Sequence, residues 1–278
     1  MLASLAHLVR FPTELYRYRS LIATLVRREI KGRYLQSAFG GVWAVLNPLV
    51  MLAVYTFVFS GILRGRIPDT EMSPDRASSQ FTFALYLFCG MIPWTAFAEG
   101  LHRSTSIVIE NANLIKKVAF PSEILPVYVV LYTVVNEAIG LGLLIVASLI
   151  FMHKVSFFIV LYPVLLLLKI VFSFGMAYFF AGFNVFVRDF AHLIGLFTTL
   201  WMFLTPIFYF RETIPEKLRW ILALNPMYHL INAYRDIFLN GRMPSPAGVG
   251  IFLLFAVMAF AVGYLFFVNS KHKFADEI

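Results

Sequence analysis

Cysteine and charged residues are scarce in this sequence of 278 residues. The single cysteine, Cys89, excludes an internal disulfide and any cysteine-rich metal site. Charged residues make up 14 % of the chain and hydrophobic residues 60 %, whereas soluble domains have about 25 % charged and about 45–50 % apolar residues. The same numbers exclude intrinsic disorder, which needs high charge and low hydrophobicity. The composition predicts an all-α integral membrane protein with several spans.

Signatures of nucleotide and zinc sites are missing as well. None of the eight lysines follows a glycine, so the sequence has no Gly-Lys-Ser/Thr loop for the phosphates of ATP. The six histidines include no pair at i and i+4, which excludes the helical zinc motif. We therefore expect no catalytic residue, metal or cofactor in this chain, and any use of ATP must come from a partner.

Six apolar runs are candidates for membrane spans, each of which takes about 20 residues in a helix. The fourth run has 33 residues, about 50 Å of helix, so it must tilt or extend beyond the membrane. We expect a single transmembrane domain over 1–278, with an arm over 1–41, the spans within 42–268 and a tail over 269–278. The six runs are 42–63, 81–98, 124–152, 155–187, 190–210 and 249–268.

The distribution of Lys and Arg predicts the orientation. The net charge of +8 is better explained by the basic bias of cytoplasmic segments than by nucleic-acid binding. With the amino terminus inside, 13 Lys and Arg residues lie on the cytoplasmic side and 9 on the other. Seven of the 13 precede the first span, which usually dominates orientation. Both termini are expected in the cytoplasm, and 99–123 is expected as a cytoplasmic loop.

Two segments outside the spans have helical character. Residues 21–34 form a basic amphipathic pattern that is typical of a helix in the headgroup plane. It is either an ordinary membrane anchor or a helix that also meets a cytoplasmic partner. Residues 211–248 are apolar in part but interrupted by Asn225-Pro226 and by charges. We expect short re-entrant or interfacial helices there, on the outer side between spans 5 and 6. The basic residues of the first pattern are Arg27, Arg28, Lys31 and Arg33.

Two charges, Glu137 and Lys169, fall inside predicted spans. A charge at the centre of a bilayer costs about 2.5 kcal/mol or more and normally faces the helix bundle or a cavity. The two residues lie at nearly equal distances along the chain from the turn between spans 3 and 4, so their depths differ by only about 1.5 Å in straight helices. We predict that they approach each other. The alternative is that Lys169 bonds backbone carbonyls while Glu137 faces a channel.

Four sequence patterns, in order, resemble the membrane subunits of ABC-2 type exporters. The patterns are RxIKxRYxxSxxGxxWxxLNPL at 28–49, GxxPW at 90–94, NxxLIKKxxFP at 111–121, and LNPxxxxxxxYR at 224–235. Each pattern alone is weak, but together they cover essentially the whole chain. The sequence looks most like the permeases that export O-antigen polysaccharide, and it is similar to teichoic acid and capsule exporters.

The resemblance implies a homodimer with two copies of a separate ATP-binding subunit, which would hold ATP and Mg²⁺. It implies a lipid-linked glycan as substrate, contact with membrane lipids, and a bacterial inner (plasma) membrane location. It also places the ATPase-coupling helix in the cytoplasmic loop and makes spans 1 and 5 channel walls. The coupling candidates are Glu110, Asn111, Asn113, Lys116 and Lys117. The channel-lining candidates are Tyr55, Phe59, Phe197, Trp201 and Phe208.

Three functions remain to be compared. The first is a permease for a lipid-linked polysaccharide, whose pyrophosphate could meet the basic residues of 21–34. The second is a related permease for a small amphiphile, such as a drug or a lipo-oligosaccharide. The third is an intramembrane enzyme, which would need clustered acids, nucleophiles or metal ligands at one depth. Only Glu137 and Lys169 meet that condition, and no His or Asp joins them, so an enzyme is disfavoured. A wide channel with aromatic walls would favour the polymer, and a narrow lateral cleft would favour the amphiphile; the resemblance favours the polymer.

Overall fold

The computed structural model describes residues 2–34, 40–58, 80–117, 120–153 and 155–278. These residues form helices, turns and short connections, with no strand among them. The longer helices are α1 (Leu2–Arg17), α2 (Arg19–Tyr34), α3 (Trp43–Tyr55), α5 (Gln80–Glu110), α7 (Ile124–Met152), α8 (Tyr162–Phe186), α9 (Phe190–Leu204), α11 (Pro226–Arg235) and α12 (Pro246–Ser270). The shorter ones are η1 (Gly40–Val42), α6 (Ala112–Lys117), η3 (Phe157–Leu161), η4 (Arg211–Thr213), η5 (Glu216–Leu218), α10 (Trp220–Ala223), η6 (Asp236–Asn240), η7 (Lys271–Lys273) and α13 (Phe274–Glu277).

Within the described residues, five helical segments are long and apolar enough to cross a membrane. The run expected over 190–210 forms a helix only as far as Leu204, because Thr205 is extended, as is usual for a residue before proline. With 15 residues, α9 is about 22 Å long, shorter than the roughly 30 Å hydrocarbon core. A sixth span therefore stays a prediction. The five segments are Gly40–Val58, Thr82–Glu110, Ile124–Met152, Phe157–Phe186 and Pro246–Glu277.

The second span continues further than the sequence indicates. We expected it to end at residue 98 and to be followed by a cytoplasmic loop, but α5 runs on to Glu110. The extension is helical because Leu101, Ile107 and Val108 bury their side chains on one face. Charged and polar residues on the opposite face lower the mean hydropathy of 99–110, so the segment does not read as part of an apolar run. The expectation of a loop over 99–110 is wrong.

Helix α5 lies at the centre of the bundle, against α7, α8, α9 and α11. Cys89 is fully buried there, as a small apolar residue. The most extensive contact joins α8 and α12, where Gly175 and Gly263 face each other. A methyl group on Gly263 would overlap the carbonyl oxygen of Gly175. Small residues at such crossings allow two membrane helices to approach closely.

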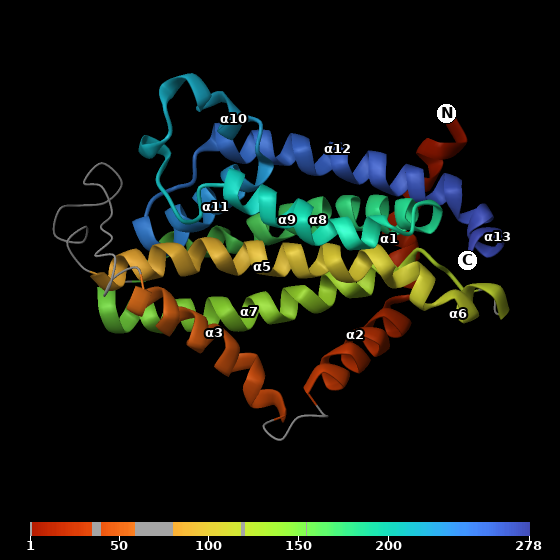
Figure 1. Cartoon of the computed structure of the whole chain (residues 1–278), viewed down its shortest axis with the longest axis horizontal. Helices are drawn as coiled ribbons and strands as arrows, with labels where there is room; N and C mark the ends of the chain where they lie inside the picture. Colours follow the sequence, from red (N-terminus) through yellow and green to blue (C-terminus); the bar gives the residue numbers. More distant parts are fainter. Residues whose placement is uncertain (1, 35–39, 59–79, 118–119, 154) are drawn as a thin grey trace.

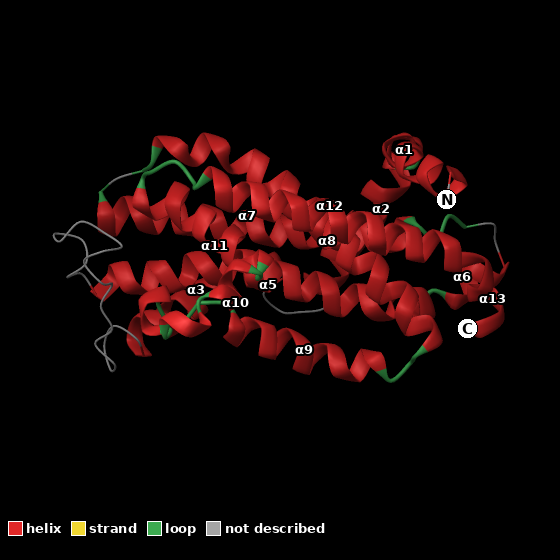
Figure 2. Ribbon diagram, turned by 90° about the horizontal axis from the view of Figure 1, so that it is seen from above, coloured by secondary structure: helices red, strands yellow, loops and turns green. Residues whose placement is uncertain are grey.

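The two ends of the bundle differ. Figure 1 shows both chain termini at one end, together with α6 and α13. The short helices α10 and α11 lie toward the opposite end, near the start of α12 (Figure 1, and Figure 2 from above). Helices α2 and α3 form a V in Figure 1, and both contact the bundle, α2 at α7 and α3 at α5 and α7. The predicted short helices of 211–248 are therefore present in the structure, and their depth in the membrane stays a prediction.

Candidate functional site

A buried ion pair joins α7 and α8 in the middle of the bundle. The Lys169 ammonium contacts Oε2 of Glu137, and the two side chains are 2 % and 0 % exposed. The approach expected from their equal depth is thus present in the structure. Because each charge would be costly alone in an apolar bundle, this contact explains how both are accommodated.

Two tyrosines extend this pair toward α11. Tyr234 donates a hydrogen bond of 2.7 Å to Oε1 of Glu137, and Tyr162 packs edge-on against the Tyr234 ring at 5.9 Å. Glu137 therefore links α7 to α8 through Lys169 and to α11 through Tyr234. Sequence reasoning missed Tyr234 as a partner, although the YR pattern at 234–235 marked the position.

A cavity of about 560 Å³ lies beside Glu137, between α3, α5 and α7. Apolar side chains make up much of its wall, as in most small-molecule sites, and polar groups are few. Tyr55 is a buried lining residue of the cavity. Its ring makes an edge contact with the Phe208 ring, with 6.4 Å between the ring centres. The polar lining residues are Arg33, Asn47, Thr95, Glu99, Asn136 and Glu137, with the ring-bearing Trp43 and Tyr55.

Arg33 contributes to the wall of this cavity instead of projecting freely from α2. Its guanidinium contacts the carboxylate of Glu99 and the hydroxyl of Tyr132. Burial lowers the pKa of Arg33, but the hydrogen bond with Tyr132 and the charge of Glu99 raise it by more, so the net pKa lies above its ordinary value. A second ion pair, Arg103 with Glu29, also connects α5 to α2.

The apolar side of α2 packs on protein. Ile22 and Leu25 are buried in a cluster that includes Tyr128 of α7. By contrast, Arg27, Arg28 and Lys31 are exposed. The amphipathic pattern therefore corresponds to a helix held against the bundle. Its contact with lipid headgroups stays a prediction, for which all four basic residues are accessible, although Arg33 also pairs with Glu99.

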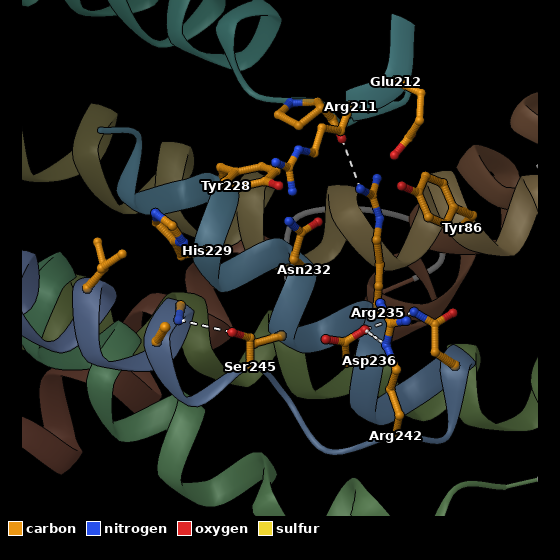
Figure 3. Close-up of a pocket in the computed structure, with 16 residues that line it drawn as sticks. Tyr86, Arg211, Glu212, Tyr228, His229, Asn232, Arg235, Asp236, Arg242 and Ser245 are labelled. Carbon is orange, nitrogen blue, oxygen red and sulfur yellow. Dashed lines mark hydrogen bonds and ion pairs between the residues drawn. The ribbon is translucent and has the colours of Figure 1, made fainter. Parts of the chain in front are cut away.

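Residues 224–235, which carry the LNP…YR pattern, connect α11 to α9 and to the turn after it at the end of the bundle opposite the termini. Asn225 caps α11 by accepting from the Met227 amide at 3.1 Å, and it accepts from the Trp201 indole at 3.0 Å. The Arg235 guanidinium donates to the carbonyls of Pro206 and Ile207 at 2.9 and 3.0 Å. The same group lies over the Tyr86 ring of α5, 3.5 Å from its centre. Figure 3 shows this arginine crossing from α11 to the turn after α9.

Comparison with known proteins identifies the family. The family described as ABC-2 type transporter matches residues 20–239. The chain belongs to the ABC-2 type transporter family. It is 32 % identical over 279 aligned residues to the O-antigen export system permease protein RfbA of Myxococcus xanthus, covering 98 % of this chain and all of that protein. It is 28 % identical to RfbA of Klebsiella pneumoniae over 92 % of this chain and 94 % of that protein. The polysialic acid transport protein KpsM of Escherichia coli is 21 % identical, over 87 % and 90 % of the two chains.

In this ABC-2 chain, the expected coupling residues gather at the end that carries both termini. Asn111 joins α5 to α6 and donates to the carbonyl of Ile107 at 2.8 Å. Lys116 donates to the backbone oxygen of Ile278, so α6 contacts the carboxyl-terminal helix. Glu110 and Asn113 are exposed. Lys117 ends α6, and its side chain lies outside the described residues.

The four predicted channel-lining aromatics that the structure describes lie in two different surroundings. Of the five, Tyr55 lines the cavity and Phe208 packs against Tyr55. Trp201 instead packs into the bundle against Trp94, Phe97 and Phe172, and Phe197 packs on Trp201. Phe59 lies outside the described residues. Their role as channel walls stays a prediction.

Proposed function

We propose that this ABC-2 chain is the permease subunit of an ATP-driven exporter that moves a lipid-linked, O-antigen-like polysaccharide across the bacterial inner membrane. The observation that carries the proposal is the similarity to RfbA of Myxococcus xanthus over the full length of that protein. The related KpsM of Escherichia coli, named for polysialic acid transport, supports a polymer as the cargo.

The working unit in this proposal is a homodimer with two copies of an ATP-binding subunit. That subunit would bind ATP and Mg²⁺, because this sequence has no phosphate-binding loop of its own. It would contact the end of α5 and the helix α6, where Glu110 of α5 and Asn113 and Lys116 of α6 are exposed. Both termini share this end of the bundle (Figure 1), which is consistent with their predicted place in the cytoplasm.

The contacts suggest how a movement at α6 would reach the rest of the chain. Asn111 joins α6 to α5, and α5 runs the length of the bundle to the wall of the cavity. Glu137 borders the same cavity and bonds Tyr234 of α11. A shift of α5 would thus act on the cavity and on the short helices together, as in switches between two packed arrangements.

Deleting the gene in its host tests the proposal. The amounts of lipid-linked glycan inside the cell and of glycan at the surface are measured in the deletion strain, and in strains complemented with wild type or with empty vector. We expect glycan to accumulate inside and to disappear from the surface, with recovery only by the wild-type gene. Unchanged surface glycan in a host without a second exporter would overturn the polymer proposal and favour a small amphiphile.

A further inference from the structure

A polar pocket of about 370 Å³ lies at the end of the bundle opposite the termini. Its volume is within the roughly 300–1,000 Å³ of small-molecule sites. The turn after α9 and η4 form one side, α11 and η6 the floor, and the start of α12 the other side. It is separate from the cavity beside Glu137, with which it shares no lining residue.

The two charged side chains of the floor, Asp236 and Arg235, already contact other groups of the chain. Asp236 accepts from Arg242 at 2.7 Å and from Asn240 at 2.9 Å. Arg235 is directed to two backbone carbonyls and the Tyr86 ring. With Arg211 and Glu212 at the rim, the lining holds three arginines and two carboxylates. Since both signs are present in nearly equal number, the pocket favours an uncharged polar ligand over an anion or a cation.

Four side chains around the opening have unused hydrogen-bonding groups. Among the residues that the structure describes, no hydrogen bond is made by the side chains of Arg211, Glu212 or Asn232, or by the hydroxyl of Tyr228. Figure 3 shows Asn232 at the centre of the pocket, Tyr228 beside it, and Glu212 approaching from above. The set includes a cation, an anion, an amide and a phenol, so both donors and acceptors border one pocket.

We propose that this pocket binds a saccharide unit of the exported glycan as it leaves the transporter. Sugar hydroxyls both donate and accept hydrogen bonds, which the mixed set of groups satisfies better than a single-sign cluster would. The half-buried ring of Tyr228 offers a flat apolar surface for the C–H face of a sugar. The inference rests on the proposed function, because it takes this end of the bundle as the exit side.

Binding is measured on the full-length chain in lipid nanodiscs by saturation-transfer difference NMR. The probes are surface polysaccharide released from the host by mild acid, methyl glycosides of glucose, galactose, mannose, rhamnose and N-acetylglucosamine, and inorganic phosphate. The pocket variants are Asn232→Ala and Tyr228→Leu. Lys217→Ala is the matched control, since Lys217 is exposed in η5 near the pocket without lining it. Thermal melting of each variant in the same nanodiscs shows that it is folded.

We expect the released polysaccharide and at least one glycoside to bind wild type and the control equally, and the pocket variants about tenfold more weakly. Absence of saccharide binding to wild type, equal binding to all four proteins, or binding of phosphate alone would overturn the inference. These outcomes are separate from the test of the proposed function. Normal export with no saccharide binding rejects only the pocket, whereas unchanged surface glycan after gene deletion rejects the polymer exporter.

Discussion

Removing one member of the buried pair, Glu137 or Lys169, is expected to destabilise the protein more than removing both. Replacement of Glu137 by Leu leaves the Lys169 ammonium unpaired beside an apolar wall, and it also deprives Tyr234 of its acceptor. An uncompensated buried charge costs about 3–5 kcal/mol, and a lost hydrogen bond about 1 kcal/mol. We therefore expect a loss of about 4 kcal/mol for Glu137→Leu and about 3 kcal/mol for Lys169→Met.

The double variant leaves no buried charge at this point and loses only the Tyr234 bond. Its expected cost is about 1–2 kcal/mol. Because the two single variants together cost about 7 kcal/mol, the expected coupling between the two positions is about 5 kcal/mol. The free energy of unfolding is measured for wild type, both single variants and the double variant by SDS titration in mixed micelles. Circular dichroism follows the transition.

The pair Lys271–Glu123 provides the control cycle, because its lysine side chain is 40 % exposed. Exposed pairs contribute about 0–1 kcal/mol, and their coupling should stay within that range. Additive costs at Glu137 and Lys169, or a loss below about 1 kcal/mol for Glu137→Leu, would refute the view that the two charges depend on each other.

Three further changes have defined outcomes. Gly263→Ala should lower the free energy of unfolding by about 1–3 kcal/mol, because its methyl group overlaps the facing glycine's carbonyl; Gly142→Ala, with open space at its Cβ, should change it by less than about 0.5 kcal/mol. Asn225→Ala should cost about 2 kcal/mol in the same titration, since α11 loses its cap and the Trp201 indole loses its acceptor; a loss below about 0.5 kcal/mol would contradict this. Arg33→Ala should speed tryptic cleavage within α2, because the Arg33 side chain joins α2 to α5 and α7. The site is partly exposed, so the free energy of unfolding should fall by only about 1 kcal/mol. An unchanged cleavage rate would show that α2 is held by its apolar face alone.

The membrane helices and their central ion pair were largely predictable from the sequence. Long apolar runs give the spans because a bilayer requires a minimum length of apolar helix. Glu137 and Lys169 were predictable as a pair because a short turn connects their helices, so residue counting gives their depth. Tyr234 was not predictable in this way. It comes from α11, almost a hundred residues away in the chain, and no local periodicity relates it to α7.

The prediction of a loop over 99–110 failed because the helix continues beyond the apolar run and its charged residues form ion pairs with α2. Charged residues such as Glu99 and Arg103 suggested a loop, yet each pairs with a residue of α2 and the helix continues beneath them. Arg33, expected at lipid headgroups, also contacts Glu99 and Tyr132 of the bundle, while its side chain is 41 % exposed. Sequence patterns show that a charge is present and leave open whether lipid, water or another helix satisfies it.

Helix contacts in the bundle differ in how closely they are packed: α8 and α12 are in close contact at glycines, whereas α3 is little buried. Helices α8 and α12 meet through glycines with no room for a methyl group, and small changes there are costly because packed interiors have few voids. The segment Gly40–Val58, which contains α3, is the least buried of the five apolar segments: 6 % of its most apolar stretch is buried within the chain. A cavity separates part of α3 from α5 and α7. A helix with few buried contacts is displaced at lower free-energy cost than one inside a close-packed pair. Rearrangement of this ABC-2 chain is therefore expected to be concentrated where α3 meets α5 and α7, beside Glu137, while α8 and α12 move as one unit.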